Sequence, residues 1–169
     1  MPALFALATS VGVLAIVATW LFFGPLEILH AQVWQAFIAW GAHYHCGGKL
    51  KGTQDTIVCM SFGALIGMLA VMLAGAIGAL GQFAAPIAVG VGATVIVLSS
   101  SIKFLAAIPA SVYGFAAIAG LWLLGGPSGA NILGSDHVSA AFLPTVLSIV
   151  VGALFGIVSE NVAGALTKK

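Results

Sequence analysis

Charge is what this sequence has least of. Only 5% of its 169 residues are Asp, Glu, Lys or Arg, and arginine is absent altogether. Soluble domains carry about 25% charged residues because their surfaces face water, so the composition excludes an ordinary water-soluble domain. The lack of arginine and of a basic patch also excludes a surface that attracts a nucleic-acid backbone. With 62% hydrophobic residues, the chain is expected to have the lipid bilayer as its solvent and main partner.

Cysteine is also scarce, with only Cys46 and Cys59 in the sequence. Two cysteines do not form the disulfide framework of a small secreted domain. Both are expected at or near the reducing face of the membrane, so we expect free thiols. The first apolar run, residues 3–23, lacks a basic segment before it and is long enough to span a bilayer. We therefore interpret it as a retained helix and not as a cleaved signal peptide.

Long apolar runs are what the sequence has in abundance. A helix needs about 20 mostly apolar residues to cross the hydrocarbon core of a bilayer. Turn residues such as Gly24-Pro25, Gly47-Gly48 and Pro86 separate the runs. The sequence therefore predicts an all-α, polytopic membrane protein that forms a single transmembrane domain over residues 1–169. Its six predicted spans are about 3–23, 26–45, 56–80, 86–101, 104–124 and 142–166, with a polar hairpin over 46–55.

The few charged residues give these six spans an orientation. Every lysine falls on one face of the membrane, whereas Glu27 and Asp136 fall on the other. The positive-inside rule assigns the lysine-rich face to the cytoplasm. Both termini are therefore expected in the cytoplasm, and residues 26–45 are expected to cross the membrane fully. The lysines concerned are Lys49, Lys51, Lys103, Lys168 and Lys169.

A short sequence echo divides the chain into halves. Gly63–Gly67 in the third span, GALIG, is similar to Gly152–Gly156 in the sixth, GALFG. Trp40-Gly41 and Tyr113-Gly114 form a second, weaker pair. We interpret the echo as two inverted three-helix repeats, a plan common in channels and transporters. The alternative is chance recurrence in a composition rich in Gly, Ala and Leu.

The same glycines are candidates for close helix packing. Lipid provides no hydrophobic force between helices, so small residues spaced four apart favour close contact between backbones. Gly63 and Gly67 share one face of the third span, and Gly152 and Gly156 share one face of the sixth. We expect them to pack helices within the chain. An interface between copies in a homo-oligomer is the alternative.

Polar residues concentrate in Trp34–Lys51 and just before it. The second span carries amides, imidazoles and aromatic rings at helical spacing, and such groups are costly in hydrocarbon when unpaired. We predict a path on which the aromatic rings set the width while the amides and imidazoles bind a polar solute. The alternative is hydrogen bonding between helices, with Trp40 and Tyr44 in an interfacial aromatic belt. The predicted path residues are Gln32, Trp34, Gln35, Phe37, Trp40, His43, Tyr44 and His45.

Metal binding and catalysis have little support in the sequence. His43-x-His45-Cys46 offers typical ligands, but its spacing is not that of a standard metal site. No pair of acidic residues is expected in the middle of the membrane, where an ion-coupled carrier usually needs one. We therefore expect no metal, no cofactor and no enzyme activity.

Two motifs resemble a known family. The first is W-x-x-F-x-x-W-G within Trp34–Gly48, which ends in a Gly pair, and the second is Ile108-Pro109-Ala110 followed by Gly114-Phe115-Ala116. Together with the length and span layout, they are similar to the bacterial inner-membrane family of unknown function DUF 1097, the YcdZ-like proteins. The resemblance implies a small multi-pass protein of the bacterial inner (plasma) membrane. It implies no activity, and His43 and His45 depart from the bulkier apolar residues of the family pattern at that place.

The sequence as a whole predicts a membrane channel or facilitator for a small, neutral, polar solute. Urea or a similar amide is the expected class, because amide-sized solutes suit an aromatic path with Gln and His groups and no fixed charge. Small channels often assemble as symmetric oligomers, so we expect a homo-oligomer. Two alternatives stay open. One is a secondary transporter driven by an ion through Glu160 and the second-span histidines, and the other is a non-transporting scaffold or complex subunit.

Overall fold

The computed structural model describes residues 1–124 and 141–167, and over these ranges it is helical with no strand. This confirms the all-α prediction. Short 3₁₀ helices lie at Glu27–Leu29 (η1), Gly78–Phe83 (η2) and Lys103–Leu105 (η3). The α-helices of the described residues are α1 (Ala3–Phe22), α2 (Val33–His45), α3 (Lys49–Ala76), α4 (Ala84–Ser99), α5 (Ile108–Leu124) and α7 (Leu143–Thr167).

The helices differ in whether they can cross a bilayer alone. In the described part of the chain, 4 helical segments are long and apolar enough to do so: Ala3–Phe22, Lys49–Ala76, Gly78–Ser99 and Leu143–Thr167. Large apolar side chains on their outer surfaces are exposed, as the 76% exposure of Leu4 and the 69% exposure of Leu98 illustrate. Such a surface is suited to lipid and not to water. By contrast, α2 has 13 residues and extends only about 20 Å, less than the hydrocarbon thickness of about 30 Å.

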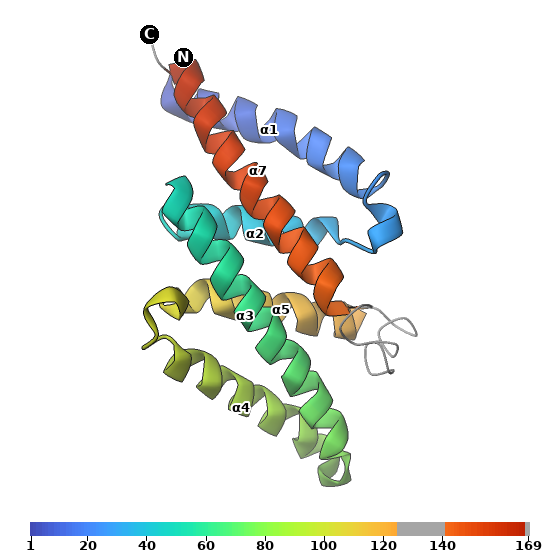
Figure 1. The fold of residues 1–169 in the computed structure, drawn as a ribbon. Helices are drawn as coiled ribbons and strands as arrows, with labels where there is room; N and C mark the ends of the chain where they lie inside the picture. The colour runs from blue at the N-terminus through green and yellow to red at the C-terminus, as the bar shows by residue number, and fades with distance from the viewer. Residues whose placement is uncertain (125–140, 168–169) are drawn as a thin grey trace.

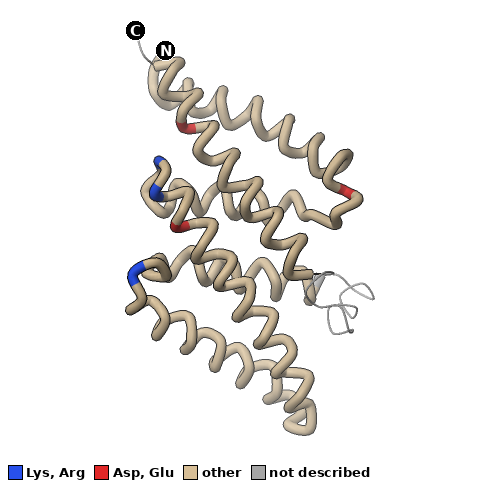
Figure 2. Tube along the Cα trace, viewed as in Figure 1, with Lys and Arg blue, Asp and Glu red and all other residues tan. Residues whose placement is uncertain are grey.

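The helices run alternately between two ends of the bundle (Figure 1). α1, α3 and α5 run in one direction, and α2, α4 and α7 return. The end with the start of α1, the α2–α3 turn, η3 and the end of α7 also carries Lys49, Lys51 and Lys103 (Figure 2). We call it the lysine end, and we call the opposite end, where η1 with Glu27 lies, the far end. The remaining charged residues of the orientation argument, Asp136, Lys168 and Lys169, lie outside the described residues.

The two long helices α3 and α7 each pack mainly against helices from the other half of the chain. α3 lies against α4 and α5, whereas α7 lies against α1 and α2. Gly63 and Gly67 lie where α3 packs against α5. A Cβ on Gly63 would overlap the backbone of Ser111 in α5, and a Cβ on Gly67 would lie 2.9 Å from the carbonyl oxygen of Phe115. Side chains at these two positions would therefore force α3 and α5 apart.

Gly152 and Gly156 occupy the corresponding places on α7. A Cβ on Gly152 would overlap the backbone of Ala36 in α2. A Cβ on Gly156 would lie 2.6 Å from Cγ of His43. The glycine pair thus brings the backbones of α2 and α7 together and leaves room for the imidazole ring. All four glycines of the sequence echo lie at helix contacts inside the chain.

The second predicted span, residues 26–45, is interrupted before α2. His30 adopts a left-handed conformation with φ 54, and Gln32 is extended with φ −109 and ψ 117. The N–H of Gln32 donates to Oγ of Ser148 in α7 at 2.8 Å, so it does not join a helical ladder. The helix predicted from residue 26 therefore begins only at Val33, because a contact with α7 holds the preceding chain in a different conformation.

The third helix begins earlier than predicted, because the expected polar hairpin over 46–55 is mostly helical. The turn is confined to the residues before Lys49, with Gly47 and Gly48 at positive φ values of 92 and 67. Lys51 and Asp55 then form an i, i+4 ion pair, with Nζ 2.6 Å from Oδ2. The hairpin prediction was wrong beyond Gly48, since the polar residues lie on the first turns of α3.

Candidate functional site

α2 carries buried polar groups along most of its length. It packs against α7, α3 and α5, and Gln35 and His43 each have 0% exposed surface. These two residues lie about 12 Å apart along the helix axis. We call the polar groups of α2 and their partners the α2 seam. It consists of Gln35, Trp40, His43 and Tyr44 in α2, Thr53 in α3, and Thr145, Ser159 and Glu160 in α7.

Gln35 connects α2 to two other helices. Its Nε2 donates to the carbonyl oxygen of Ala117 in α5 at 3.1 Å and to Oγ1 of Thr145 in α7 at 3.1 Å. The carbonyl of Ala117 can only accept, and this fixes which side of the Gln35 amide carries the nitrogen. Within the described residues, Oε1 of Gln35 is buried and has no hydrogen-bond partner. An unpaired amide oxygen is costly inside a membrane protein, so this atom is suited to accept an N–H or O–H from a small polar molecule.

The hydroxyl of Ser159 is the shared hydrogen-bond partner in the middle of the seam. Nε1 of Trp40 donates to its Oγ at 2.9 Å, and the hydroxyl of Tyr44 lies 2.7 Å from the same atom. The Oγ of Ser159 donates in turn to the carbonyl of Gly156 at 2.7 Å, so Tyr44 is the donor in its contact with Ser159. The ring of Trp40 stacks with Phe37 and with Phe155, at centroid separations of 5.8 Å and 5.5 Å. The middle of the seam is therefore an aromatic layer with one shared hydroxyl.

His43 and Glu160 form the lysine end of the seam. Nε2 of His43 lies 3.1 Å from Oε2 of Glu160, and its Nδ1 lies 3.1 Å from Oγ1 of Thr53. Oγ1 of Thr53 also donates to the carbonyl of Lys49 at 3.1 Å. The imidazole is fully buried, whereas 32% of the Glu160 side chain is exposed. An imidazole and a carboxylate thus share a site that reaches from the interior to the surface.

The hydrogen bonds among Thr53, His43 and Glu160 depend on whether one further proton is bound to this group. When Thr53 donates to the carbonyl of Lys49, its oxygen must accept from Nδ1–H of His43. Nε2 then needs a second proton to donate to an ionised Glu160, or Glu160 must itself carry the proton and donate to Nε2. In both of these arrangements one proton lies between the two side chains. In the arrangement without it, Nε2–H of a neutral His43 donates to the ionised Glu160, and the Thr53 hydroxyl donates to Nδ1 of His43 in place of the carbonyl of Lys49. The same heavy-atom distances fit both, and the proton-free arrangement leaves Glu160 as a carboxylate.

The α2–α3 turn is shaped around the Glu160 carboxylate. The backbone N–H of Lys49 donates to Oε2 at 2.6 Å. A Cβ on Gly48 would lie 3.0 Å from both carboxylate oxygens, so only glycine allows this approach. Lys49 has φ 56, a left-handed value that costs free energy for a residue other than glycine. The carboxylate therefore accepts a backbone N–H at the start of α3, where the helix dipole favours a negative charge.

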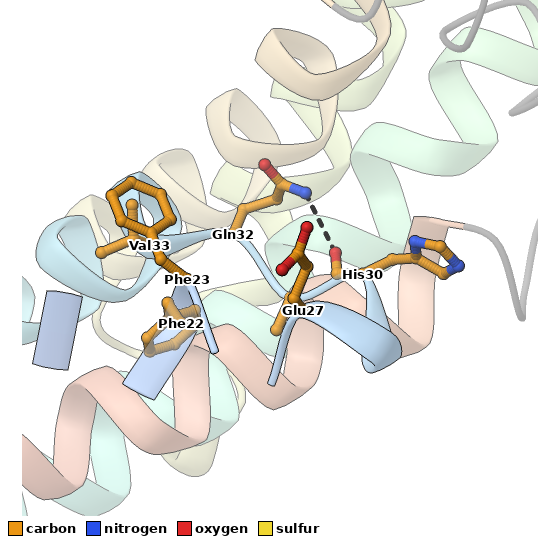
Figure 3. Close-up of a pocket in the computed structure, with 7 residues that line it drawn as sticks. Phe22, Phe23, Glu27, His30, Gln32 and Val33 are labelled. Atoms are coloured by element: carbon orange, nitrogen blue, oxygen red, sulfur yellow. Dashed lines mark hydrogen bonds between the residues drawn. The ribbon is translucent and has the colours of Figure 1, made fainter. Parts of the chain in front are cut away.

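An open pocket of about 470 Å³ lies at the far end, next to the start of α2. Figure 3 shows Phe22, Phe23 and Val33 as its apolar wall, while the imidazole of His30 points away from the other labelled side chains. Nε2 of Gln32 donates to the carbonyl of His30 at 3.0 Å. The carboxylate of Glu27 and the amide of Gln32 supply the polar part of the lining.

A second open pocket, of about 590 Å³, lies at the lysine end. Lys49 and Leu50 of α3 line one side, and Glu160, Asn161 and Gly164 of α7 line the other. Glu160 belongs both to this pocket and to the α2 seam. The seam therefore lies between two pockets, one at each end of the bundle.

The comparison with protein families identifies the chain. A family model described as "Protein of unknown function (DUF1097)" matches residues 8–164. The chain belongs to the DUF1097 family. Comparisons with curated proteins and with solved structures gave no match. The family description assigns the α2 seam no chemistry, and the long apolar helices support a membrane protein.

The predicted path residues fall into two groups. Gln35, Trp40, His43 and Tyr44 lie together in the α2 seam with partners on other helices. The others lie around it: Gln32 lines the far pocket, the Trp34 ring lies against Gly120 of α5, Phe37 is 40% exposed, and Nδ1 of His45 lies 2.7 Å from the Tyr113 hydroxyl. Gln35, Trp40 and His43 are buried and Tyr44 is half-buried, so in this structure the first group lies at helix contacts and not along an open channel.

The sequence interpretation gave too little weight to the seam residues of α7. A stripe of small and hydroxyl side chains runs along one face of that helix, and every member of it is buried. Spacings of three and four residues are visible in the sequence and could have indicated this face. The stripe consists of Thr145, Ser148, Gly152, Gly156, Ser159 and Ala163.

The cysteines and histidines near the α2–α3 turn do not form a metal site. In the part of the chain that the structure describes, no three side chains of His, Cys, Asp or Glu come close enough to hold a metal ion. His43 and His45 contact different helices. Cys46 and Cys59 are both free. Burial raises the pKa of the Cys46 thiol, which lies in the turn after α2.

Proposed function

We propose that this protein is a membrane facilitator for a small, neutral, polar solute and that the solute moves along the α2 seam. One observation carries the proposal: buried polar groups lie between a pocket at each end of the bundle. Polar groups inside a membrane protein cost free energy and usually mark a pathway or a binding site. A row of them between two openings is suited to bind a polar solute at successive positions.

The chemistry of the seam supports an amide-like solute such as urea. Gln35 offers an acceptor oxygen, and Ser159 with Tyr44 and Trp40 offers a hydroxyl-centred cluster of hydrogen-bonding groups. A solute with both N–H groups and a carbonyl can donate to the Gln35 oxygen, and it can accept from Trp40 or Tyr44 when that group is released from Ser159. The stacked rings of Phe37, Trp40 and Phe155 favour a flat solute of small cross-section.

Passage requires α7 to move against α2, because the seam is packed closed in this structure. Trp40 is only 4% exposed and stacks with two other rings. We propose that the chain consists of two inverted three-helix repeats, α1–α2–α3 and α4–α5–α7, and that they rock against each other. The packing of the two long helices supports this, since each lies mainly against helices of the other repeat. α3 lies against α4 and α5, whereas α7 lies against α1 and α2.

The proposed setting is a bacterial inner membrane crossed six times, with the lysine end and both termini in the cytoplasm. The alternating direction of the helices and the position of Lys49, Lys51 and Lys103 at one end support this orientation. α2 would complete its crossing together with η1 and the extended residues before Val33. A symmetric homo-oligomer is the expected assembly, and chemical crosslinking in native membranes tests it.

Solute flux into proteoliposomes tests the proposed function directly. The purified protein is reconstituted, and shrinkage and reswelling after an osmotic step of urea, acetamide or glycerol are followed by light scattering. We expect faster entry of the amides than in protein-free liposomes, with no requirement for an ion gradient. Entry no faster than in protein-free liposomes for all three solutes would overturn the proposal. If a stoichiometric second protein also copurified, a scaffold would be favoured.

A secondary transporter is the second candidate, and the contact between His43 and Glu160 favours it. Glu160 lies about a turn and a half inside the predicted sixth span, 142–166. The structure joins its carboxylate to a fully buried imidazole. Ion-coupled carriers use groups of this kind to bind a proton. Uphill uptake that a proton gradient drives, and that an uncoupler abolishes, would replace the passive facilitator by this candidate.

A further inference from the structure

Glu160 joins three helices at the lysine end. It extends from α7, contacts the buried imidazole of His43 in α2 and accepts the N–H of Lys49 at the start of α3. Its exposed part lines the lysine-end pocket, so water reaches the carboxylate while the imidazole is shielded. A proton from this side therefore meets Glu160 first.

We propose that Glu160 and His43 bind one exchangeable proton and that its binding releases the α2–α3 turn and opens the seam at the lysine end. The proposal rests on the proposed function, because the seam is the path that would open. The proton comes from water in the pocket and attaches to a carboxylate oxygen of Glu160. No other bond forms or breaks, and the proton returns to water when the pocket becomes less acidic.

The release follows from the change of charge. An ionised carboxylate accepts short, strong hydrogen bonds, and a neutral acid accepts weaker ones. On protonation, Glu160 therefore holds the Lys49 N–H less firmly, and it also loses its favourable interaction with the N-terminus of α3. Gly48 and Lys49 have positive φ, and the strained conformation of Lys49 is retained only while its surroundings hold it. When the hydrogen bond from the Lys49 N–H to Glu160 weakens, this turn can relax away from α7.

Other titratable groups lie at this end, and they differ from Glu160 in their surroundings. Lys49 lines the same pocket, while Lys51 and Asp55 are paired with each other on α3. In α2, Tyr44 bonds to Ser159 and His45 to Tyr113 of α5. Cys46 follows in the turn, and the N-terminal amine of α1 lies 3.4 Å from the carbonyl of Leu166. Asp55 is the matched control acid, because it lies at the same end and, within the described residues, its carboxylate hydrogen-bonds to Lys51 and not to the seam.

The first test compares urea flux across the acid and neutral pH range in wild type, Glu160→Gln and Asp55→Asn. We expect wild-type flux to rise at least several-fold as the pH falls, because protonation opens the lysine end. Glu160→Gln, which is neutral at all pH values, should show high flux with little pH dependence. Asp55→Asn should keep the wild-type profile. The same pH profile in wild type and folded Glu160→Gln would overturn the proposal.

A second test needs no transport and separates this proposal from the proposed function. Infrared difference spectra between acid and neutral pH, recorded on the protein in lipid, detect the carbonyl band of a protonated carboxylic acid. We expect a band that Glu160→Gln removes and Asp55→Asn retains. Hydrogen exchange of the wild type should show the Lys49 amide losing protection, relative to its intrinsic rate, as the pH falls. If the protein carries no flux but both signals occur, only the proposed function fails.

If Glu160→Gln does not fold, measurements on the wild type alone still decide the second test. Constant protection of the Lys49 amide across the acid range would show that the turn stays bound whatever the protonation state. That result would overturn the proposed release. Absence of any carboxylic acid band assigned to Glu160 would overturn the proposed proton site.

Discussion

The backbone N–H of Lys49 donates to the carboxylate of Glu160 at 2.6 Å, across 111 positions of the sequence. The residues that enter α2 are held in a similar way, since the N–H of Gln32 donates to Oγ of Ser148 at 2.8 Å. Ser148 and Glu160 both belong to α7. One helix therefore anchors the chain at both ends of α2. Any movement that opens the α2 seam must loosen at least one of these two anchors.

Gly152→Ala should destabilise the fold. The new Cβ would overlap the backbone of Ala36, which cannot move aside as a flexible side chain can. Overpacking of this kind costs about 1–3 kcal/mol of unfolding free energy. Reversible unfolding of the purified protein in mixed detergent micelles measures the loss.

Gly164→Ala is the matched control for that substitution. It lies in the same helix, and a Cβ there meets nothing within 4 Å. Because alanine is the better helix former, we expect no loss and a gain of up to about 1 kcal/mol. Equal losses for Gly152→Ala and Gly164→Ala would contradict the close contact of α7 with α2.

Ser159→Ala should also destabilise the fold, by a different route. The change removes the acceptor of the buried Trp40 indole N–H and the partner of the Tyr44 hydroxyl. A buried polar group without a partner costs about 1–3 kcal/mol. Ser101→Ala removes an exposed hydroxyl whose hydrogen bond, within the described residues, goes to Leu98 of its own turn, so its effect should stay within about 0.5 kcal/mol. Similar effects of the two substitutions on unfolding would show that the Ser159 contacts contribute little.

Local features of the fold are predictable because they depend on nearby residues. The all-α class follows from long apolar runs, and the turn at Gly47-Gly48 follows from residues that adopt positive φ without strain. The breaks that differ from prediction depend on distant partners. α2 begins late because Ser148 binds the N–H of Gln32, and α3 begins early with Glu160 bound to the N–H of Lys49. No local pattern contains either contact.

The candidate site also combines features that the local sequence predicts with contacts that depend on distant residues. The polarity of Gln35, Trp40 and His43 is visible in the sequence, and they do lie in the seam. Their partners are not visible, because His43 and Glu160 are 117 positions apart. A span position alone suggests that Glu160 lies near the surface. The imidazole that reaches it from inside the bundle changes what the carboxylate can do.

Cys46 should react slowly with a maleimide at neutral pH. Burial raises the pKa of its thiol, so the reactive thiolate is a small fraction of the total at pH 7. Below the raised pKa, the labelling rate should increase about tenfold for each pH unit, and it should level off above the pKa. Cys59 is only 1% exposed and should stay unlabelled in the folded protein.

The same cysteine tests the orientation of the chain. With the lysine end in the cytoplasm, a membrane-impermeant maleimide should label Cys46 in inverted inner-membrane vesicles and not in intact spheroplasts. Cys46→Ser should abolish the labelling in both. Labelling of intact spheroplasts that Cys46→Ser removes would place the lysine end outside and reverse the proposed topology.

Gln35→Leu should reduce urea flux while the protein stays folded. The variant removes the acceptor oxygen that, within the described residues, has no partner, together with the Nε2 donor to Ala117 and Thr145, and its apolar side chain ends one atom short of them. One hydrogen bond to a solute contributes on the order of 1–1.5 kcal/mol, which corresponds to a fall in flux of about tenfold. Thr94→Val is the control, because Thr94 is exposed on α4 and its hydrogen bond in the described part of the chain is to Gly90 of its own helix. Unchanged flux in a folded Gln35→Leu protein would mean that the solute does not pass this amide, and the path would have to lie outside the α2 seam.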